Sequence, residues 1–216
     1  MKTQNKQICD GELYEQRFGF KERRANTYFY TALLLMLFAV CAFRVYWQTT
    51  FGGVVVDGAS MERTLSSGDR LLMKYVKDVE DLQYGDVIVV NVSSYRGSST
   101  RGDYLIKRLS AKEGDKVKFE QGNMYIWYAG ADGYTVLDEP YAYYYDKSTY
   151  QCSEYTVGEG EIFFLGDNRQ NSIDSRYGIQ NGSHLADRLY KVEDIYGIVP
   201  EWAVENQKIL EKIFFH

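Results

Sequence analysis

The stretch "GGVVVDGASMERTLSSGDRLLMKYV", residues 52–76, carries the pattern that decides the fold. Two short runs rich in Val, Leu and Met flank a segment rich in Gly, Ser and Asp, which is typical of two strands joined by a turn. In the joining segment a lone serine, Ser60, is followed directly by the bulky apolar Met61. Ser, Gly and Asp are ordinary turn formers, so a plain turn is one interpretation of Ser60, and a functional serine is another.

The same pattern continues along the chain after residue 48. Short apolar runs bounded by Gly and Asp each predict a strand. These runs are "DRLLMKYV", "GDVIVVNV", "DYLIKRLS", "DKVKFE", "NMYIWY", "EIFFLGD" and "DIYGIVPEW". The sequence therefore predicts a mainly β domain over residues 48–216, of the sandwich or partly closed barrel type.

The composition excludes several classes of function. The chain has 216 residues and a formal net charge of -5, whereas a general nucleic-acid binder needs a basic surface. Its three cysteines, Cys9, Cys41 and Cys152, form no C-x-x-C pair, and its two histidines are His184 and His216. A Cys/His zinc site and a Ser-His-Asp triad are therefore both disfavoured, and we expect no metal and no cofactor.

An uncharged segment near the start predicts a membrane span. "TYFYTALLLMLFAVCAF", residues 27–43, together with the flanking "RVYW", approaches the ~20 residues that cross a bilayer. We expect residues 1–26 to form a cytoplasmic tail, residues 27–47 a transmembrane anchor in the plasma membrane, and residues 48–216 an extracytoplasmic domain. The orientation follows from the basic residues that precede the segment, Lys21, Arg23 and Arg24.

The span has two alternative interpretations. A cleaved signal peptide is possible, but the region before the apolar segment, some 26 residues, is longer than such regions normally are. A buried core helix is disfavoured because the segment is apolar on all sides and follows a basic cluster.

Two further segments allow more than one interpretation. Residues 129–160 are rich in tyrosine and look loop-like, so they form either a surface for extended peptide or lipid headgroups, or an insertion whose rings pack on the sheet. The tail "EWAVENQKILEKIFFH", residues 201–216, predicts a weakly amphipathic helix that packs on the body or lies at the membrane.

Lys107 is a candidate base for a serine hydroxyl. On a strand, Leu105 and Lys107 share one face while Ile106 and Arg108 share the other. If the Leu105 face is buried, Lys107 is desolvated and Arg108 stays in water. Desolvation lowers the pKa of a lysine, and a neutral lysine can activate a serine nucleophile. The alternative is a lysine on an edge strand with its amine in water.

The stretch "GDNRQNSIDSR", residues 166–176, concentrates hydrogen-bonding groups directly after an apolar strand. Asp174 and Arg176 lie on one face of an extended chain, so they could form an ion pair. A calcium loop is disfavoured, because the regular D-x-D-x-D-G spacing is missing and two arginines would repel the ion.

Taken together, these stretches resemble the sequence boxes of type I signal peptidases, or leader peptidases, which are membrane-bound Ser/Lys endopeptidases. The matching stretches are "GASMERTL", "YLIKRLSAKEGDKV" and "GDNRQNSIDSR", and "YGDVIVVNV" is similar to the strand box at Gly85 and Asp86. Their order and the upstream anchor also agree, over about residues 25–200. The chain resembles the shorter, Gram-positive form of the family.

The resemblance implies the catalytic roles. Ser60 would be the nucleophile and Lys107 its general base. The backbone N–H of Ser60 would stabilise the oxyanion, and at Gly58, where some members have a serine, only the backbone could assist.

The resemblance also implies supporting roles. Ser172 would orient the lysine amine, Asp174 and Arg176 would brace the site, and Asp167 would support it. Met61 would pack beside the nucleophile and contact the substrate.

Some positions depart from the family pattern. Arg63 stands where the serine box has a proline, which predicts a looser turn with a free N–H. Ala111 and Glu113 replace a glycine and a proline in the lysine box. These changes spare Ser60 and Lys107.

The expected function is cleavage of N-terminal signal peptides from exported preproteins at the outer membrane face. An alternative is a catalytically weak, membrane-anchored assembly or chaperone factor of the same fold, as in pilus biogenesis. A self-cleaving repressor with a Ser/Lys pair would need a DNA-binding domain, and residues 1–50 hold a span instead.

Overall fold

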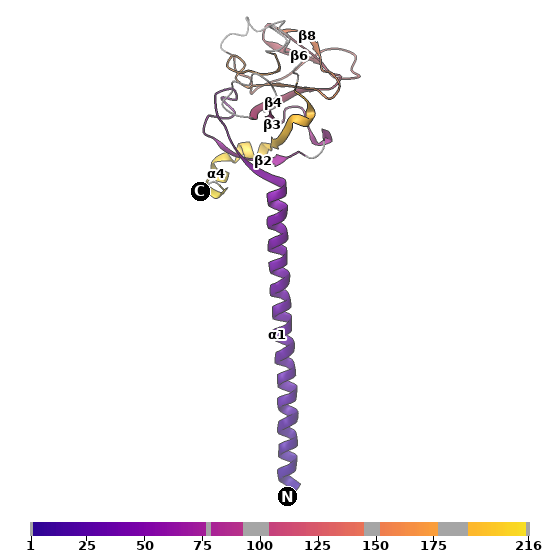
Figure 1. Ribbon diagram of the computed structural model, residues 1–216, viewed down its shortest axis with the longest axis vertical. Helices are drawn as coiled ribbons and strands as arrows, with labels where there is room; N and C mark the ends of the chain where they lie inside the picture. The colour runs from indigo at the N-terminus through magenta and orange to yellow at the C-terminus, as the bar shows by residue number, and fades with distance from the viewer. Residues whose placement is uncertain (1, 77–78, 93–103, 145–151, 177–189, 215–216) are drawn as a thin grey trace. The chain divides into compact units, whose positions relative to one another are not determined.

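The computed structural model describes residues 2–76, 79–92, 104–144, 152–176 and 190–214 (Figure 1). The chain forms two compact units, Met1–Thr49 and Thr50–His216. The histidines considered above, His184 and His216, lie outside the described residues, and so does the side chain of Cys152.

The first unit is one helix, α1, which runs from Lys2 to Thr50. Its part Asn26–Thr50 is long and apolar enough to cross a membrane. Large apolar side chains such as Leu34, Leu35 and Phe38 are exposed there, and such an apolar surface needs a nonpolar surrounding. These features are consistent with a membrane-anchored protein. The helix begins at Lys2, so the predicted tail of residues 1–26 is itself largely helical.

The second unit contains two antiparallel sheets. The six-stranded sheet has the order β1-β2-β10-β3-β4-β9, and the four-stranded sheet has the order β7-β6-β5-β8. The strands of the first sheet are β1 (Phe51–Val55), β2 (Arg70–Tyr75), β3 (Val87–Asn91), β4 (Tyr104–Lys112), β9 (Ile162–Leu165) and β10 (Ile195–Val199). The strands of the second sheet are β5 (Lys116–Glu120), β6 (Asn123–Trp127), β7 (Thr135–Val136) and β8 (Cys152–Thr156). The prediction of a mainly β domain is confirmed.

Two strands were missing from the sequence prediction, and both lie in the Tyr-rich residues 129–160. The strand β7 has two residues, and β8 has the sequence "CSEYT", which is no apolar run. Their pairing partners β6 and β5 determine these strands, since neither segment carries a clear strand pattern of its own.

The described helices of the second unit are short. They are the 3₁₀ turns η1 (Val79–Asp81) and η4 (Val192–Asp194), followed by α3 (Glu201–Glu205) and α4 (Gln207–Phe214). The helix predicted for the tail is therefore present, although it is interrupted at Asn206.

Two hydrophobic cores meet at the strands β4 and β9. Leu109 and Phe164 pack into the core that contains Ile88 and Val90. Ala111 and Phe163 pack into the other core, with β5 and β6. The polar stretch 166–176 begins directly after β9, and β9 pairs with β4, which bears Lys107. This pairing brings the lysine stretch and the polar stretch together.

Candidate active site

Ser60 lies in a compact turn after β1. The N–H of Glu62 donates to the Ala59 carbonyl at 3.2 Å, and the N–H of Leu65 donates to the Met61 carbonyl at 2.8 Å. Met61 is 1% exposed, so its side chain anchors the turn in the core, while Ser60 itself is only half-buried. The predicted contact of Met61 with substrate stays a prediction, since its buried side chain offers little surface to a ligand.

Lys107 reaches this turn from the middle of β4. Its Nζ lies 2.7 Å from Ser60 Oγ and donates to the Ile106 carbonyl at 2.9 Å. The side chain is 3% exposed, and Leu109 on the same face is fully buried. The structure therefore supports the first interpretation of Lys107, in which the amine is desolvated, and not a lysine with its amine in water.

Burial lowers the pKa of the Lys107 amine to about 8, and the nearby carboxylates of Asp174 and Asp167 partly oppose this effect. The neutral amine thus becomes the main form only a little above neutral pH. A neutral amine within hydrogen-bond distance of a serine hydroxyl can accept its proton.

Arg108 differs from the expectation that it stays in water. Its side chain is about 12% exposed, and Nε and Nη2 donate to the two oxygens of Asp167 at 2.9 and 2.7 Å. Its Nη1 donates to the Gly85 carbonyl at 2.7 Å. The outward face of β4 is covered by other segments, which a strand period cannot reveal.

Asp167 links the lysine strand to the serine turn. Besides Arg108, it accepts a hydrogen bond from Thr64 Oγ1 at 2.5 Å. The next residue, Asn168, donates from its N–H to the Ser60 carbonyl and from Nδ2 to the Ala59 carbonyl, both at 3.0 Å. The start of the polar stretch thereby holds the backbone carbonyls of Ala59 and Ser60.

Gly166 is needed for this close approach. A Cβ built on Gly166 would lie 2.6 Å from the Ser60 carbonyl oxygen and would also overlap the Ser172 side chain. No side chain larger than hydrogen fits without moving the serine turn.

Asp174 and Arg176 form the ion pair that their spacing predicts. The guanidinium Nε and Nη2 donate to the two carboxylate oxygens, each at 2.6 Å. Asp174 also accepts from the Gly166 N–H at 3.0 Å. Burial raises the pKa of Asp174 to about 6, so the carboxylate is still charged at neutral pH. Through the Gly166–Asp174 hydrogen bond, the end of the loop 166–176 is joined to its first residue.

The predicted contact between Ser172 and the lysine amine is absent among the described residues. Among the described residues, Lys107 Nζ makes its hydrogen bonds to Ser60 and Ile106. Ser172 Oγ is buried beside Gly166. Its role in orienting the amine stays a prediction.

The backbone donors near Ser60 differ in availability. The N–H of Gly58 donates to Ser67 Oγ at 3.2 Å, and Gly58 has a φ of 101°, which favours glycine. Within the described ranges, no acceptor is found for the N–H of Ser60. The Ser60 N–H is therefore the freer of the two to bind an oxyanion.

Tyrosines of the Tyr-rich segment pack on arginines around the site, which the sequence did not reveal. The guanidinium carbon of Arg108 lies 3.9 Å from the ring centroid of Tyr141, and that of Arg63 lies 3.8 Å from the ring centroid of Tyr143. The backbone of Tyr143 also pairs with the polar stretch, since its N–H donates to the Asp167 carbonyl at 2.7 Å.

Glu139 and Tyr144 fasten the same segment to Arg169. Arg169 Nη1 donates to Glu139 at 2.8 Å and to the Tyr144 hydroxyl at 2.7 Å, and Nη2 also contacts Glu139. Both partners of the ion pair are buried. Of the two interpretations of the segment, packing is the one that these contacts support. Among its described tyrosines, Tyr134 and Tyr155 pack on Trp127 and Phe163 of the sheets, while Tyr141 and Tyr143 pack on arginines of the site.

Arg63 also changes the expected backbone of the serine turn. Its φ is 78°, in the left-handed region that non-glycine residues rarely adopt. Proline, with φ near −65°, cannot take this conformation. The turn here is therefore a different one from a turn with proline at the same position.

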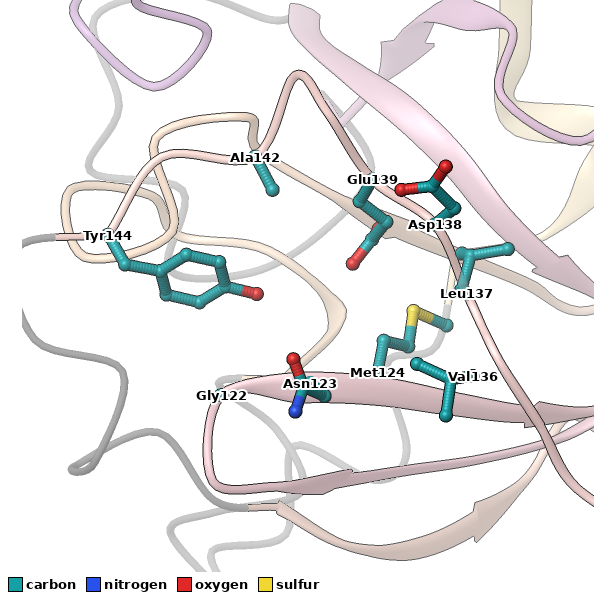
Figure 2. Close-up of a pocket in the computed structure, with 9 residues that line it drawn as sticks. All are labelled: Gly122, Asn123, Met124, Val136, Leu137, Asp138, Glu139, Ala142 and Tyr144. Carbon is teal, nitrogen blue, oxygen red and sulfur yellow. The ribbon is translucent and has the colours of Figure 1, made fainter.

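A cavity of about 260 Å³ lies beside the site but does not include it. Met124, Val136, Glu139 and Tyr144 are among the residues that line it (Figure 2). Neither Ser60 nor Lys107 belongs to the lining, and Glu139 and Tyr144 of the lining contact Arg169 of the polar stretch. In the described part of the chain, no three His, Cys, Asp or Glu side chains gather to hold a metal ion.

Comparison with known proteins gives consistent matches. The family described as signal peptidase, peptidase S26, matches residues 29–207. A signal peptidase I from Bacillus amyloliquefaciens is 29% identical over 167 residues, which are 73% of this chain and 80% of that protein. Signal peptidase I P from Bacillus subtilis subsp. natto is 30% identical over 170 residues, 77% of this chain and 83% of that protein. A solved signal peptidase I from Enterococcus faecalis is 22% identical, with a TM-score of 0.39, and covers 58% of this chain and 99% of its own.

Proposed function

Since the chain belongs to the signal peptidase family, peptidase S26, and is a type I signal peptidase, we propose that it cleaves preproteins with Ser60 as nucleophile and Lys107 as general base. The observation that carries this proposal is the 2.7 Å distance between Lys107 Nζ and Ser60 Oγ, with the amine buried. No histidine lies among the described residues, and Lys107 Nζ is a basic group within hydrogen-bond distance of the Ser60 hydroxyl.

The first step is acylation. The neutral Lys107 amine takes the hydroxyl proton as Ser60 Oγ attacks the scissile carbonyl carbon. The carbonyl oxygen becomes an oxyanion, to which the Ser60 N–H can donate, and one such donor is typically worth ~3 kcal/mol. Collapse of the intermediate breaks the C–N bond, and the ammonium of Lys107 gives its proton to the leaving amine of the mature protein.

The second step is deacylation. The signal peptide is then held as an ester on Ser60. Lys107, neutral again, takes a proton from water, whose oxygen attacks the ester carbonyl. The ester bond breaks, Ser60 regains its proton from Lys107, and the signal peptide leaves with a free carboxylate.

The supporting contacts favour a rigid site. Asn168 holds the Ser60 carbonyl, Asp167 joins Thr64 to Arg108, and Asp174 closes the loop on Gly166. Burial of the Lys107 amine destabilises the folded state. The rigid contacts around the site keep the side chain from moving out into solvent.

The substrate would bind as an extended strand. The strand β1, which leads to the Ser60 turn, forms one edge of the six-stranded sheet in the described part of the chain. An edge strand offers backbone groups to an added peptide. The preference for small residues before the cleavage site is implied by the resemblance to the family.

The enzyme would work at the outer face of the plasma membrane. The predicted anchor, residues 27–47, lies within the apolar stretch Asn26–Thr50 and would span the bilayer with residues 1–26 inside, as the basic residues before the span predict. Ser60 follows Thr50 by ten residues, so even an extended chain keeps it within roughly 36 Å of the end of the span. A preprotein held by its apolar signal segment would meet the site on the same surface.

The test uses the full chain in detergent or vesicles with a preprotein substrate. We expect Ser60→Ala and Lys107→Ala to lower the cleavage rate by roughly 10³-fold or more, because each removes one half of the reacting pair. Ser66→Ala, in the same turn, and Lys74→Ala, on β2, are matched controls at exposed positions and should cleave normally. Cleavage by the Ser60 variant at the normal rate would refute the assignment.

Two simpler measurements address the alternatives. If the protein were an assembly factor without catalysis, the preprotein would stay intact even when it is incubated with the protein that carries no substitution. A cleaved signal peptide would leave a membrane-bound chain shortened by forty-odd residues, whereas an anchor keeps its full mass.

A further inference from the structure

The last helix, α4, turns apolar side chains away from the body. The helix packs against β2, with Gln207 and Leu210 half-buried on that side. Ile209 and Ile213, one turn apart on another side, are 59% and 64% exposed. A helix on the surface of a water-soluble domain normally turns its apolar stripe to the core. The exposed pair of isoleucines therefore suggests that this side of α4 contacts a nonpolar environment other than the protein core.

The charges of α4 are arranged around this pair. Lys208 and Lys212 are exposed and each precedes one of the isoleucines, while Glu211 is half-buried. Exposed lysines beside exposed aliphatic side chains are typical of helices that lie in a membrane interface. There the aliphatic groups enter the edge of the acyl chains, and the ammonium groups stay at the headgroups.

Contacts within the second unit keep α4 close to the start of that unit. The ring of Phe51 lies 6.3 Å from the ring of Trp202, centroid to centroid. Phe51 directly follows Thr50, the last residue of the apolar stretch Asn26–Thr50. From Trp202 to Ile213 the two short helices α3 and α4, interrupted at Asn206, together rise by at most roughly 17 Å. The covalent chain thus keeps the isoleucines near the point where the span ends.

We propose that α4 lies in the lipid interface of the membrane that anchors the chain, with Ile209 and Ile213 toward the acyl chains and Lys208 and Lys212 at the phosphates. This inference rests on the proposed membrane anchoring. The family match ends at residue 207, so all of α4 except its first residue lies beyond it. The helix would give the catalytic unit a second attachment and so restrict the height of Ser60 above the bilayer.

The direct test is quenching of tryptophan emission by brominated lipids. In the full chain, Trp47, Trp127 and Trp202 are replaced by Phe, and Ile213→Trp supplies a single reporter. The protein is reconstituted in vesicles of phosphatidylcholine and phosphatidylglycerol, with bromine placed close to the headgroup end of the acyl chains. We expect the emission to fall clearly relative to unbrominated vesicles, as for an interfacial side chain. Unchanged emission would overturn the proposal.

A matched reporter controls for random contact with vesicles. Val136 is 53% exposed on β7, at the edge of the four-stranded sheet. Its neighbour β6 lies at the opposite end of the second unit from α4 and β2 (Figure 1). Val136→Trp in the same background should keep its emission. Equal quenching at both positions would also contradict a specific role for α4.

A second experiment separates this inference from the proposed function. The double variant Ile209→Gln/Ile213→Gln should cleave a vesicle-bound preprotein several-fold more slowly, yet cleave a short soluble peptide at the normal rate. Equal loss on both substrates would indicate a structural role and oppose the proposal. If the unchanged protein cleaves neither substrate, the proposed function fails, while the quenching measurement still decides the place of α4.

Discussion

The guanidinium carbon of Arg63 lies 3.8 Å from the ring centroid of Tyr143, so the serine turn contacts a segment eighty residues further along the chain. Arg63 takes this position with a φ of 78°. A cation over an aromatic ring is worth about 0.5–1 kcal/mol at an exposed site. This amount is of the same order as the cost of the left-handed backbone, so the contact helps to maintain an otherwise unfavourable turn.

Arg63→Pro is expected to destabilise the protein and to impair catalysis. Proline cannot adopt the φ of residue 63, so the turn must change its path next to Ser60, at a cost of more than about 1 kcal/mol. Arg63→Gly is the matched comparison, since it accepts the backbone and loses only the ring contact. Thermal unfolding and cleavage rate should show a large effect of proline and a small one of glycine. A proline variant as stable as the parent would contradict the left-handed turn.

The pH dependence of cleavage should follow Lys107. Its amine has a pKa of about 8 and must be neutral to act as a base. At pH 7 about a tenth of the molecules hold it neutral, so kcat/KM should rise roughly tenfold per pH unit below 8 and level off above it. The profile is measured with a soluble peptide whose own groups do not titrate there. A flat profile between pH 6 and 8 would exclude this lysine as the base.

Replacing Lys107 by methionine is expected to stabilise the fold at pH 7. The pKa falls from 10.5 in the unfolded chain to about 8 in the fold, so below pH 8 the folded state holds an ammonium that burial disfavours. The cost, roughly 3 kcal/mol, disappears as pH rises from about 8 to 10.5, because the unfolded chain then binds more protons. Denaturant unfolding should therefore show stability rising over this range in the parent but not in Lys107→Met.

Asp167→Asn should be strongly destabilising. The change removes the charge that pairs with Arg108 and weakens the bond from Thr64, in a place where the carboxylate is buried. Breaking a buried pair by changing one partner costs roughly 3–5 kcal/mol, because the other charge stays uncompensated. Glu120→Gln, which breaks the exposed pair with Lys118, should cost under about 1 kcal/mol. Similar losses in the two variants would show that Asp167 is not held as described.

Gly166→Ala should lower kcat more than it changes KM. The added methyl group would meet the Ser60 carbonyl and the Ser172 side chain, and the serine turn would have to move away from Lys107. A displacement of this kind can cost about 10²-fold in rate. Gly133→Ala, at a position with open space and an ordinary φ, is the control. If Gly166→Ala keeps normal kinetics, the close approach is not needed for the chemistry.

The sequence by itself determined the features that depend on local pattern. The apolar segment before residue 48, the short strands of the second unit and the tail helix each follow from the period and length of apolar runs. The sequence also suggested the proposed chemistry of the site, since Ser60, Lys107 and the stretch 166–176 combine residue types that few other functions need together.

Only the tertiary structure decided which of these groups touch. Three contacts join residues that lie 33 to 80 positions apart: Lys107 with Ser60, Arg108 with the ring of Tyr141, and Arg63 with the ring of Tyr143. Local pattern states which face a side chain takes on its own strand, but not what covers that face. The cover comes from the packing of separate segments, and this is why Arg108 was expected in water and is instead paired with Asp167 and only about 12% exposed.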